Sequence, residues 1–113
     1  NPAGAPASLV GIFHPSYDDK HQAAAQMLGD GNLAVFKGEG GESERNPDTA
    51  CQVKMLMNGN MTTEIWPAVF EHRHLKDKEM NAVRLRQVWE GAEQDEYGEA
   101  AVVTTAAIAL RVM

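Results

Sequence analysis

The residues of this 113-residue chain that could carry chemistry gather in one glycine-rich acidic segment, residues 37–48. It holds three glycines among three glutamates, one lysine and one arginine. Glycines let the backbone approach a ligand closely, and the backbone N–H groups beside them can hold a phosphate. The segment therefore predicts a phosphate or ligand loop, whose candidate contacts are Lys37, Gly38, Glu39, Gly40, Gly41, Arg45 and Asn46.

The same segment offers oxygen ligands for a metal ion at Glu42, Ser43 and Glu44. Mg²⁺ is commonly bound by one or two carboxylates together with substrate phosphates. A metal site and a phosphate site can therefore coincide here. The glycine spacing matches neither the P-loop nor the dinucleotide-binding pattern, so a solvated turn is the alternative interpretation.

The elements before this loop determine where it lies. Residues 8–13 and 32–36 are short apolar runs without polar alternation, which is typical of parallel strands covered on both faces. A helix is expected between them, through Leu28 and ended by Gly29. A strand, helix and strand over about 30 residues form one crossover unit. The loop should then begin at the carboxyl end of a parallel strand, where open α/β sheets bind ligands.

Downstream of the loop, the pattern changes twice. Residues 51–57 and 61–67 are strand-like around the turn residues 58–60, which predicts a hairpin or two adjacent short strands. Residues 79–89 predict an amphipathic helix with an apolar face at positions 82, 85 and 89. Residues 97–113 are apolar nearly all round and predict a central, buried helix. The sequence thus indicates an α/β fold with a mostly parallel sheet flanked by helices.

The charge of the chain limits its partners. The formal net charge is -6 and the pI about 5.1, so the whole chain should not attract a polyanion and any nucleic-acid contact must be local. The only basic concentration lies within residues 71–86. Its candidate nucleic-acid contacts are Arg73, Lys76, Lys78, Arg84 and Arg86, although the interleaved acidic residues also fit an ordinary solvated helix start.

The remaining features point to a cytoplasmic protein. Cys51 is the single cysteine, which excludes an internal disulfide and favours a buried small hydrophobic role. No secretory signal is evident, and no apolar segment reaches the roughly 20 residues of a membrane span, so we expect no membrane partner. His14 should make packing or capping contacts, and Trp66 and Trp89 should anchor a core or an interface.

A resemblance adds to this interpretation. The order Asn1-Pro2-Ala3, LVGIFHP at 9–15, an Ala-rich helix ending at Leu28-Gly29 and AVFKGEGGE at 34–42 resembles anthranilate phosphoribosyltransferase and its relatives. The match covers roughly the first half of the chain, and DEYGEAA at 95–101 with the apolar last helix is similar to the end of that family.

The resemblance implies a glycosyl transferase family 3 architecture. Residues 1–113 would be the C-terminal segment of a phosphoribosyltransferase-type α/β domain. The N-terminal helical domain and the first part of the α/β domain, with their substrate-binding motifs, would lie outside it. It also implies two partners, the N-terminal remainder of the same protein and a second copy in a homodimer.

The loop departs from the pattern of the enzymes that it resembles. Their loop resembles H-G-x-G-x-D-E, whose Asp and Glu bind Mg²⁺ and help to hold phosphoribosyl pyrophosphate. Here Lys37 stands in place of the histidine, Glu42 of the Asp and Ser43 of the Glu, with Glu44 one place late. The metal pair is thus altered.

The longer string Gly-Glu-Gly-Gly-Glu, followed by Glu-Arg-Asn-Pro, is similar to a paralogous branch associated with nucleic-acid binding. Three functions are considered, the first two from the resemblance and the third from the apolar last helix. The first is a nucleic-acid-binding paralogue, for DNA or RNA, without anthranilate activity. The second is an active enzyme that uses phosphoribosyl pyrophosphate with Mg²⁺. The third is a non-enzymatic dimerisation or scaffolding piece.

Overall fold

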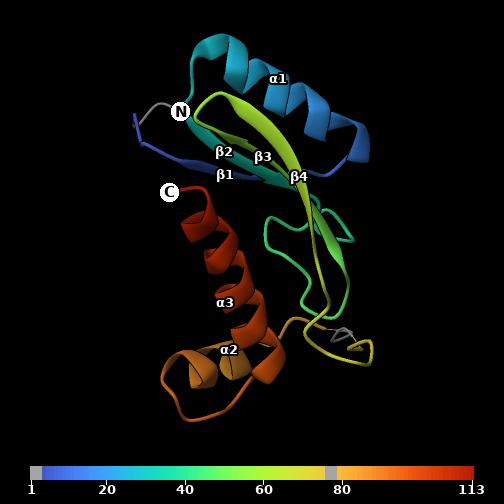
Figure 1. The fold of residues 1–113 in the computed structure, drawn as a ribbon. Coiled ribbons are helices and arrows are strands. Elements are labelled where there is room, and N and C mark those ends of the chain that lie inside the picture. Colours follow the sequence, from blue (N-terminus) through green and yellow to red (C-terminus); the bar gives the residue numbers. More distant parts are fainter. Residues whose placement is uncertain (1–3, 76–78) are drawn as a thin grey trace.

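The computed structural model describes residues 4–75 and 79–113. Its four strands form one sheet in the order β1-β2-β3-β4, and Figure 1 shows α1 on one face of this sheet and α3 on the other. The elements are β1 (Ser8–Gly11), the 3-10 turn η1 (Pro15–Tyr17), α1 (Asp18–Leu28), β2 (Asn32–Phe36), β3 (Cys51–Met57), β4 (Asn60–Trp66), α2 (Ala82–Trp89) and α3 (Glu96–Arg111).

The sheet is mixed, which corrects one part of the predicted fold. The α/β class with flanking helices is confirmed, but only β1 and β2 pair in parallel, while β2–β3 and β3–β4 are antiparallel. Parallel strands need a crossover, and helix α1 provides one only between β1 and β2. The predicted hairpin is present because Asn58 and Gly59 take positive φ angles of 50° and 81°, which a tight two-residue turn requires.

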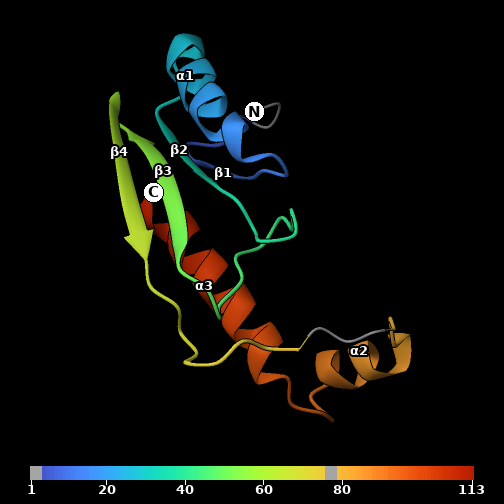
Figure 2. The same ribbon diagram turned by 90° about the vertical axis from the view of Figure 1, so that its right-hand side faces the viewer.

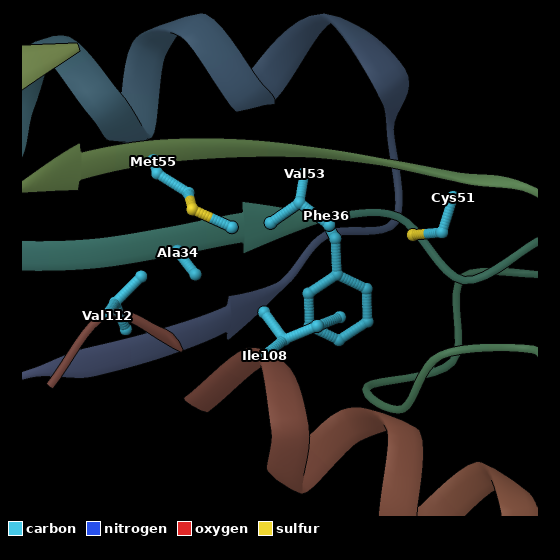
Figure 3. Packing of buried hydrophobic residues seen from close by; sticks show 7 residues of the cluster. All are labelled: Ala34, Phe36, Cys51, Val53, Met55, Ile108 and Val112. Carbon is cyan, nitrogen blue, oxygen red and sulfur yellow. The ribbon is translucent and has the colours of Figure 1, made fainter. Parts of the chain in front are cut away.

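Alternate residues of the two inner strands fill two separate cores. Leu33 and Val35 of β2 pack with Ala25 of α1 on one face. On the other face, Ala34 and Phe36 pack with Ile108 of α3, as Figure 3 shows. Because successive side chains of a strand point to opposite faces, β2 contacts α1 with one set of side chains and α3 with the other.

Helix α1 is the element that local signals predicted best. It ends at Gly29, whose φ of 73° is the left-handed conformation expected of a C-terminal glycine. The buried Gln22 side chain donates a hydrogen bond of 2.7 Å to the Met55 carbonyl and so joins the helix to β3. His14 caps the preceding turn by accepting from the Ser16 N–H, as predicted.

Helix α2 differs from the prediction in its start and in its surroundings. It begins at Ala82, three residues later than predicted, because the Asn81 side chain accepts hydrogen bonds from Val83 N and Arg84 N. Its predicted buried face is exposed, and Trp89 is 91% exposed. Figure 2 gives the reason, since α2 lies away from the sheet and no described strand covers it.

Helix α3 is not central in the described part of the chain. One face packs on the sheet through the buried Ile108, while the buried Ala101 borders a cavity next to the glycine-rich loop. The other face, including Val102 and Leu110, is exposed. The apolar pattern therefore predicted a helix correctly, but the expectation that it is buried on all sides is wrong for the described residues, which cover only one of its faces. None of the described helices has the length and apolar character of a membrane span.

Cys51 is buried, as predicted, and this leads to a test. Burial raises the pKa of its thiol, and the Arg45 charge opposes that rise only in part. Since the thiolate is the reactive form, the native protein should resist a thiol-reactive dye at about pH 8 and react fully once unfolded. Because the folded state raises this pKa, the buried neutral thiol contributes to the free energy of unfolding. That contribution is complete below the ordinary pKa of 9.0 and is lost as the pH rises through the folded-state pKa. Rapid, complete labelling of the native protein would contradict this.

Candidate functional site

The glycine-rich loop lies against the carboxyl ends of the two parallel strands. It starts directly after β2, as predicted, and Ile12 N donates to the Phe36 carbonyl where the two strands end. A Cβ atom on Gly11 would come within 2.7 Å of the Ser43 Cα atom. Gly41 has a φ of 90°, and a Cβ atom there would overlap the Phe13 ring. Both positions therefore require glycine for the loop to lie where it does.

Inside the loop, the charged side chains bind the loop's own backbone. Lys37 Nζ donates to the carbonyls of Gly38 and Glu39 at 2.9 and 2.7 Å. The Gly40 N–H donates to Glu42 Oε2 at 2.7 Å. A phosphate that uses the Gly40 N–H must therefore displace the Glu42 carboxylate.

The second half of the loop is buried and holds the loop to the rest of the fold, which the sequence did not indicate. Arg45 is 2% exposed, and its guanidinium donates to the carbonyls of Trp66 and Pro67. Its backbone N–H donates to Thr105 Oγ1 of α3 at 2.9 Å. Burial lowers the pKa of Arg45, and the nearby Cys51 opposes this shift. Arg45 and Asn46 were predicted as ligand contacts, and the structure places both of them in the interior at the border of a cavity.

That cavity lies between the loop and the first turns of α3 and has a volume of about 650 Å³. Two of the predicted Mg²⁺ ligands, Glu42 and Glu44, border it, while the Ser43 hydroxyl donates to Glu44 Oε2 at 3.1 Å. No group of three or more His, Cys, Asp or Glu side chains suited to a metal occurs among the described residues. The assignment of Mg²⁺ to these three residues stays a prediction.

The predicted nucleic-acid contacts are only partly brought together. Arg73 pairs with Glu39 and with Asp48 Oδ2. Arg84 Nε lies 2.8 Å from Glu93 Oε1, and Arg86 Nε lies 3.5 Å from Glu90 Oε1. Arg73 and Arg84 border one second cavity of about 430 Å³, whereas Arg86 does not. Lys76 and Lys78 lie outside the described residues.

Four ring side chains border this second cavity, and three of them, Phe70, His74 and Tyr97, are stacked. The His74 and Tyr97 rings are stacked, with centroids 4.2 Å apart and planes inclined by 19°. The Phe70 ring is stacked with the same Tyr97 at 6.2 Å. The sequence gives no signal for this pair, because residues 74 and 97 are far apart in the chain and no spacing pattern joins them.

The comparisons with known proteins agree with the resemblance. The chain is 41% identical over 71 residues to the anthranilate phosphoribosyltransferase of Paracidovorax citrulli, a match that covers 62% of this chain and 21% of that protein. It is 31% identical over 109 residues to the anthranilate phosphoribosyltransferase of Burkholderia ambifaria, covering 93% of this chain and 32% of that protein. These relatives support the anthranilate phosphoribosyltransferase family. No family model matches the chain. The chain spans about a fifth to a third of the length of these relatives.

The loop can now be compared with the pattern of the anthranilate phosphoribosyltransferase family. Glu42, in place of that pattern's Asp, directs a carboxylate oxygen to the Gly40 N–H. Ser43, in place of its Glu, offers a hydroxyl that is already bonded to Glu44. The described loop therefore has a different set of oxygen donors from that pattern.

Proposed function

We propose that this chain belongs to a phosphoribosyltransferase-like protein that binds nucleic acid, DNA or RNA, and lacks anthranilate activity. The observation that carries the proposed lack of anthranilate activity is the set of oxygen donors in the loop. A hydroxyl at Ser43 replaces one carboxylate of the enzyme pattern, and the Glu42 carboxylate is held by the Gly40 N–H. Mg²⁺ relies on carboxylates to hold it beside substrate phosphates, so this set is a weak one for the enzyme's reaction.

We further propose that residues 1–113 form the C-terminal segment of the α/β domain and that the remainder of the polypeptide supplies the helical domain and the upstream motifs. The match to one third of a relative's length supports this, as do the exposed apolar faces of α2 and α3. Such faces in a soluble protein are normally covered by another surface. A homodimer and a cytoplasmic location belong to the same proposal. The single, buried Cys51 supports the location.

The arginines of residues 73–86 support nucleic acid as the ligand. Arg73 lies 3.5 Å from the buried carboxylate of Asp48. Its other ion pair, with Glu39, and the pair of Arg86 with Glu90 are exposed: the arginine side chains are 56% and 78% exposed, and the two glutamates 47% and 59%. Such ion pairs contribute little to stability because water screens them, so a phosphate can replace the carboxylate at low cost. Glu39 raises the pKa of Arg73, most of all through their hydrogen bond. The guanidinium stays cationic with or without this partner.

Removing these charges provides the test. In the full-length protein, Arg73→Gln, Arg84→Gln and Arg86→Gln should each weaken binding to labelled single-stranded DNA and reduce the salt slope of log K by about 0.7, the value for one lost phosphate contact. Fluorescence anisotropy at several salt concentrations measures both quantities. Arg111→Gln is the matched control, because Arg111 pairs with Glu64 of β4, away from the loop. Unchanged slopes in all three variants would contradict the proposal.

A second candidate is an active phosphoribosyltransferase. The observation in its favour is that Glu42 and Glu44 border one cavity together with Arg84, so carboxylates and a cation face the same space. If the first proposal is correct, calorimetric titration of the full-length protein with phosphoribosyl pyrophosphate should give no Mg²⁺-dependent heat. Mg²⁺-dependent binding that is lost in Glu42→Gln would establish the second candidate in its place.

A further inference from the structure

The most distinctive unassigned feature is the aromatic stack beside the second cavity. Tyr97 is shared by two stacked pairs, with His74 at 4.2 Å and with Phe70 at 6.2 Å. Tyr97 and Phe70 are half-buried, whereas His74 is exposed. The half-buried rings of Tyr97 and Phe70 thus lie beneath the exposed ring of His74.

The backbone beneath the exposed ring is fixed. The His74 N–H donates to Asp48 Oδ2 at 2.7 Å, and the side chain of Asp48 is only 2% exposed. Asp48 belongs to the anchored end of the glycine-rich loop, where the Pro47 carbonyl also accepts from Val69 N at 2.7 Å. The ring at position 74 is therefore preorganised by the same loop that defines the site.

Two guanidinium groups flank the stack. Arg73 and Arg84 border the same cavity of about 430 Å³ as the three rings. Aromatic platforms with adjacent cations are how proteins bind single-stranded nucleic acid, because every base has a stacking face and every link carries a phosphate. Bases within a duplex are stacked on each other and cannot occupy such a platform.

We propose that His74, supported by Tyr97 and Phe70, stacks against a base of single-stranded nucleic acid, with the neighbouring phosphate on Arg73. This inference rests on the proposed nucleic-acid function and gives it a defined site. The carboxylates of Glu71, Asp95 and Glu96 also border the cavity, so a phosphate is disfavoured at the start of α3 and is directed to the Arg73 side. The same carboxylates can accept hydrogen bonds from exocyclic amino groups of a base.

The test uses the full-length protein and a labelled single-stranded cytosine oligonucleotide. His74→Ala and Tyr97→Leu should each weaken binding about five- to one-hundred-fold, the effect of losing one stacked base. His74→Phe and Tyr97→Phe keep a ring and should stay close to wild type. His14→Ala is the matched control, since the His14 ring also lies beside a tyrosine, Tyr17, with centroids 5.4 Å apart, but does not border the second cavity.

The outcomes separate this inference from the function on which it rests. If wild-type protein does not bind the oligonucleotide at low salt, the nucleic-acid function and the platform both fail. If wild-type protein binds but His74→Ala and Tyr97→Leu bind equally well, the platform alone is overturned. Equal weakening by His14→Ala, or failure of His74→Phe to restore binding, also overturns it. Selective loss with rescue by the ring-retaining variants supports it.

Discussion

Replacing Phe36 by alanine is expected to lower the free energy of unfolding by about 3–5 kcal/mol. The Phe36 side chain is 1% exposed and packs with Val53 and Ile108, between the sheet and α3 (Figure 3). Its carbonyl also accepts the Ile12 N–H where the loop begins. The truncation therefore leaves a cavity between the sheet and α3. Chemical denaturation followed by circular dichroism measures the loss.

Phe13 offers a matched control for this substitution. It follows the neighbouring parallel strand β1 but is 75% exposed. Phe13→Ala should change the free energy of unfolding by less than about 1 kcal/mol, as is usual for surface positions. Equal losses in the two variants would show that Phe36 does not occupy the core described above.

Replacing Gly11 by alanine is expected to cost about 1–3 kcal/mol and to displace the glycine-rich loop. The added Cβ atom would lie 2.7 Å from Ser43 Cα and 2.8 Å from the Ser43 carbonyl oxygen. Both are backbone atoms, so no side-chain rotation can relieve the overlap. The loop must move away from β1, and binding of any ligand that it contacts should weaken along with stability.

Gly31→Ala is the control for this prediction, because a Cβ atom at Gly31 meets nothing within 4 Å. It should leave stability within about 1 kcal/mol of wild type, with a small gain from reduced freedom of the unfolded chain. Denaturation and amide exchange of residues 38–44 in both variants would test the prediction. A stable Gly11→Ala protein with an unchanged loop would contradict the close approach of loop and strand.

Local signals in the sequence predicted most of the elements. The apolar run before the loop, the glycine at the end of α1 and the Asn58-Gly59 turn each act over a few residues, and each produced the expected structure. The mostly parallel sheet was a wrong expectation because strand direction depends on how the chain returns after the loop. The apolar faces of α2 and α3 were recognised, but periodicity cannot tell whether the covering surface lies among the described residues.

The position of the glycine-rich loop was predicted, but its contacts were not. The loop begins at the end of a parallel strand, as the crossover pattern indicated. The interior placement of Arg45 could not be foreseen, because its partners at Trp66, Pro67 and Thr105 are distant in sequence. The stack of His74 on Tyr97 depends equally on tertiary contacts.

The most direct test of the proposed function is the salt dependence of single-stranded DNA binding by the full-length protein. The titration is carried out with a metal chelator present, between about 50 mM and about 200 mM salt. We expect binding at low salt without Mg²⁺ and a linear fall of log K with log salt. The slope should be about −2 if Arg73, Arg84 and Arg86 each contact one phosphate. Absence of binding at the lowest salt concentration would contradict the proposed function.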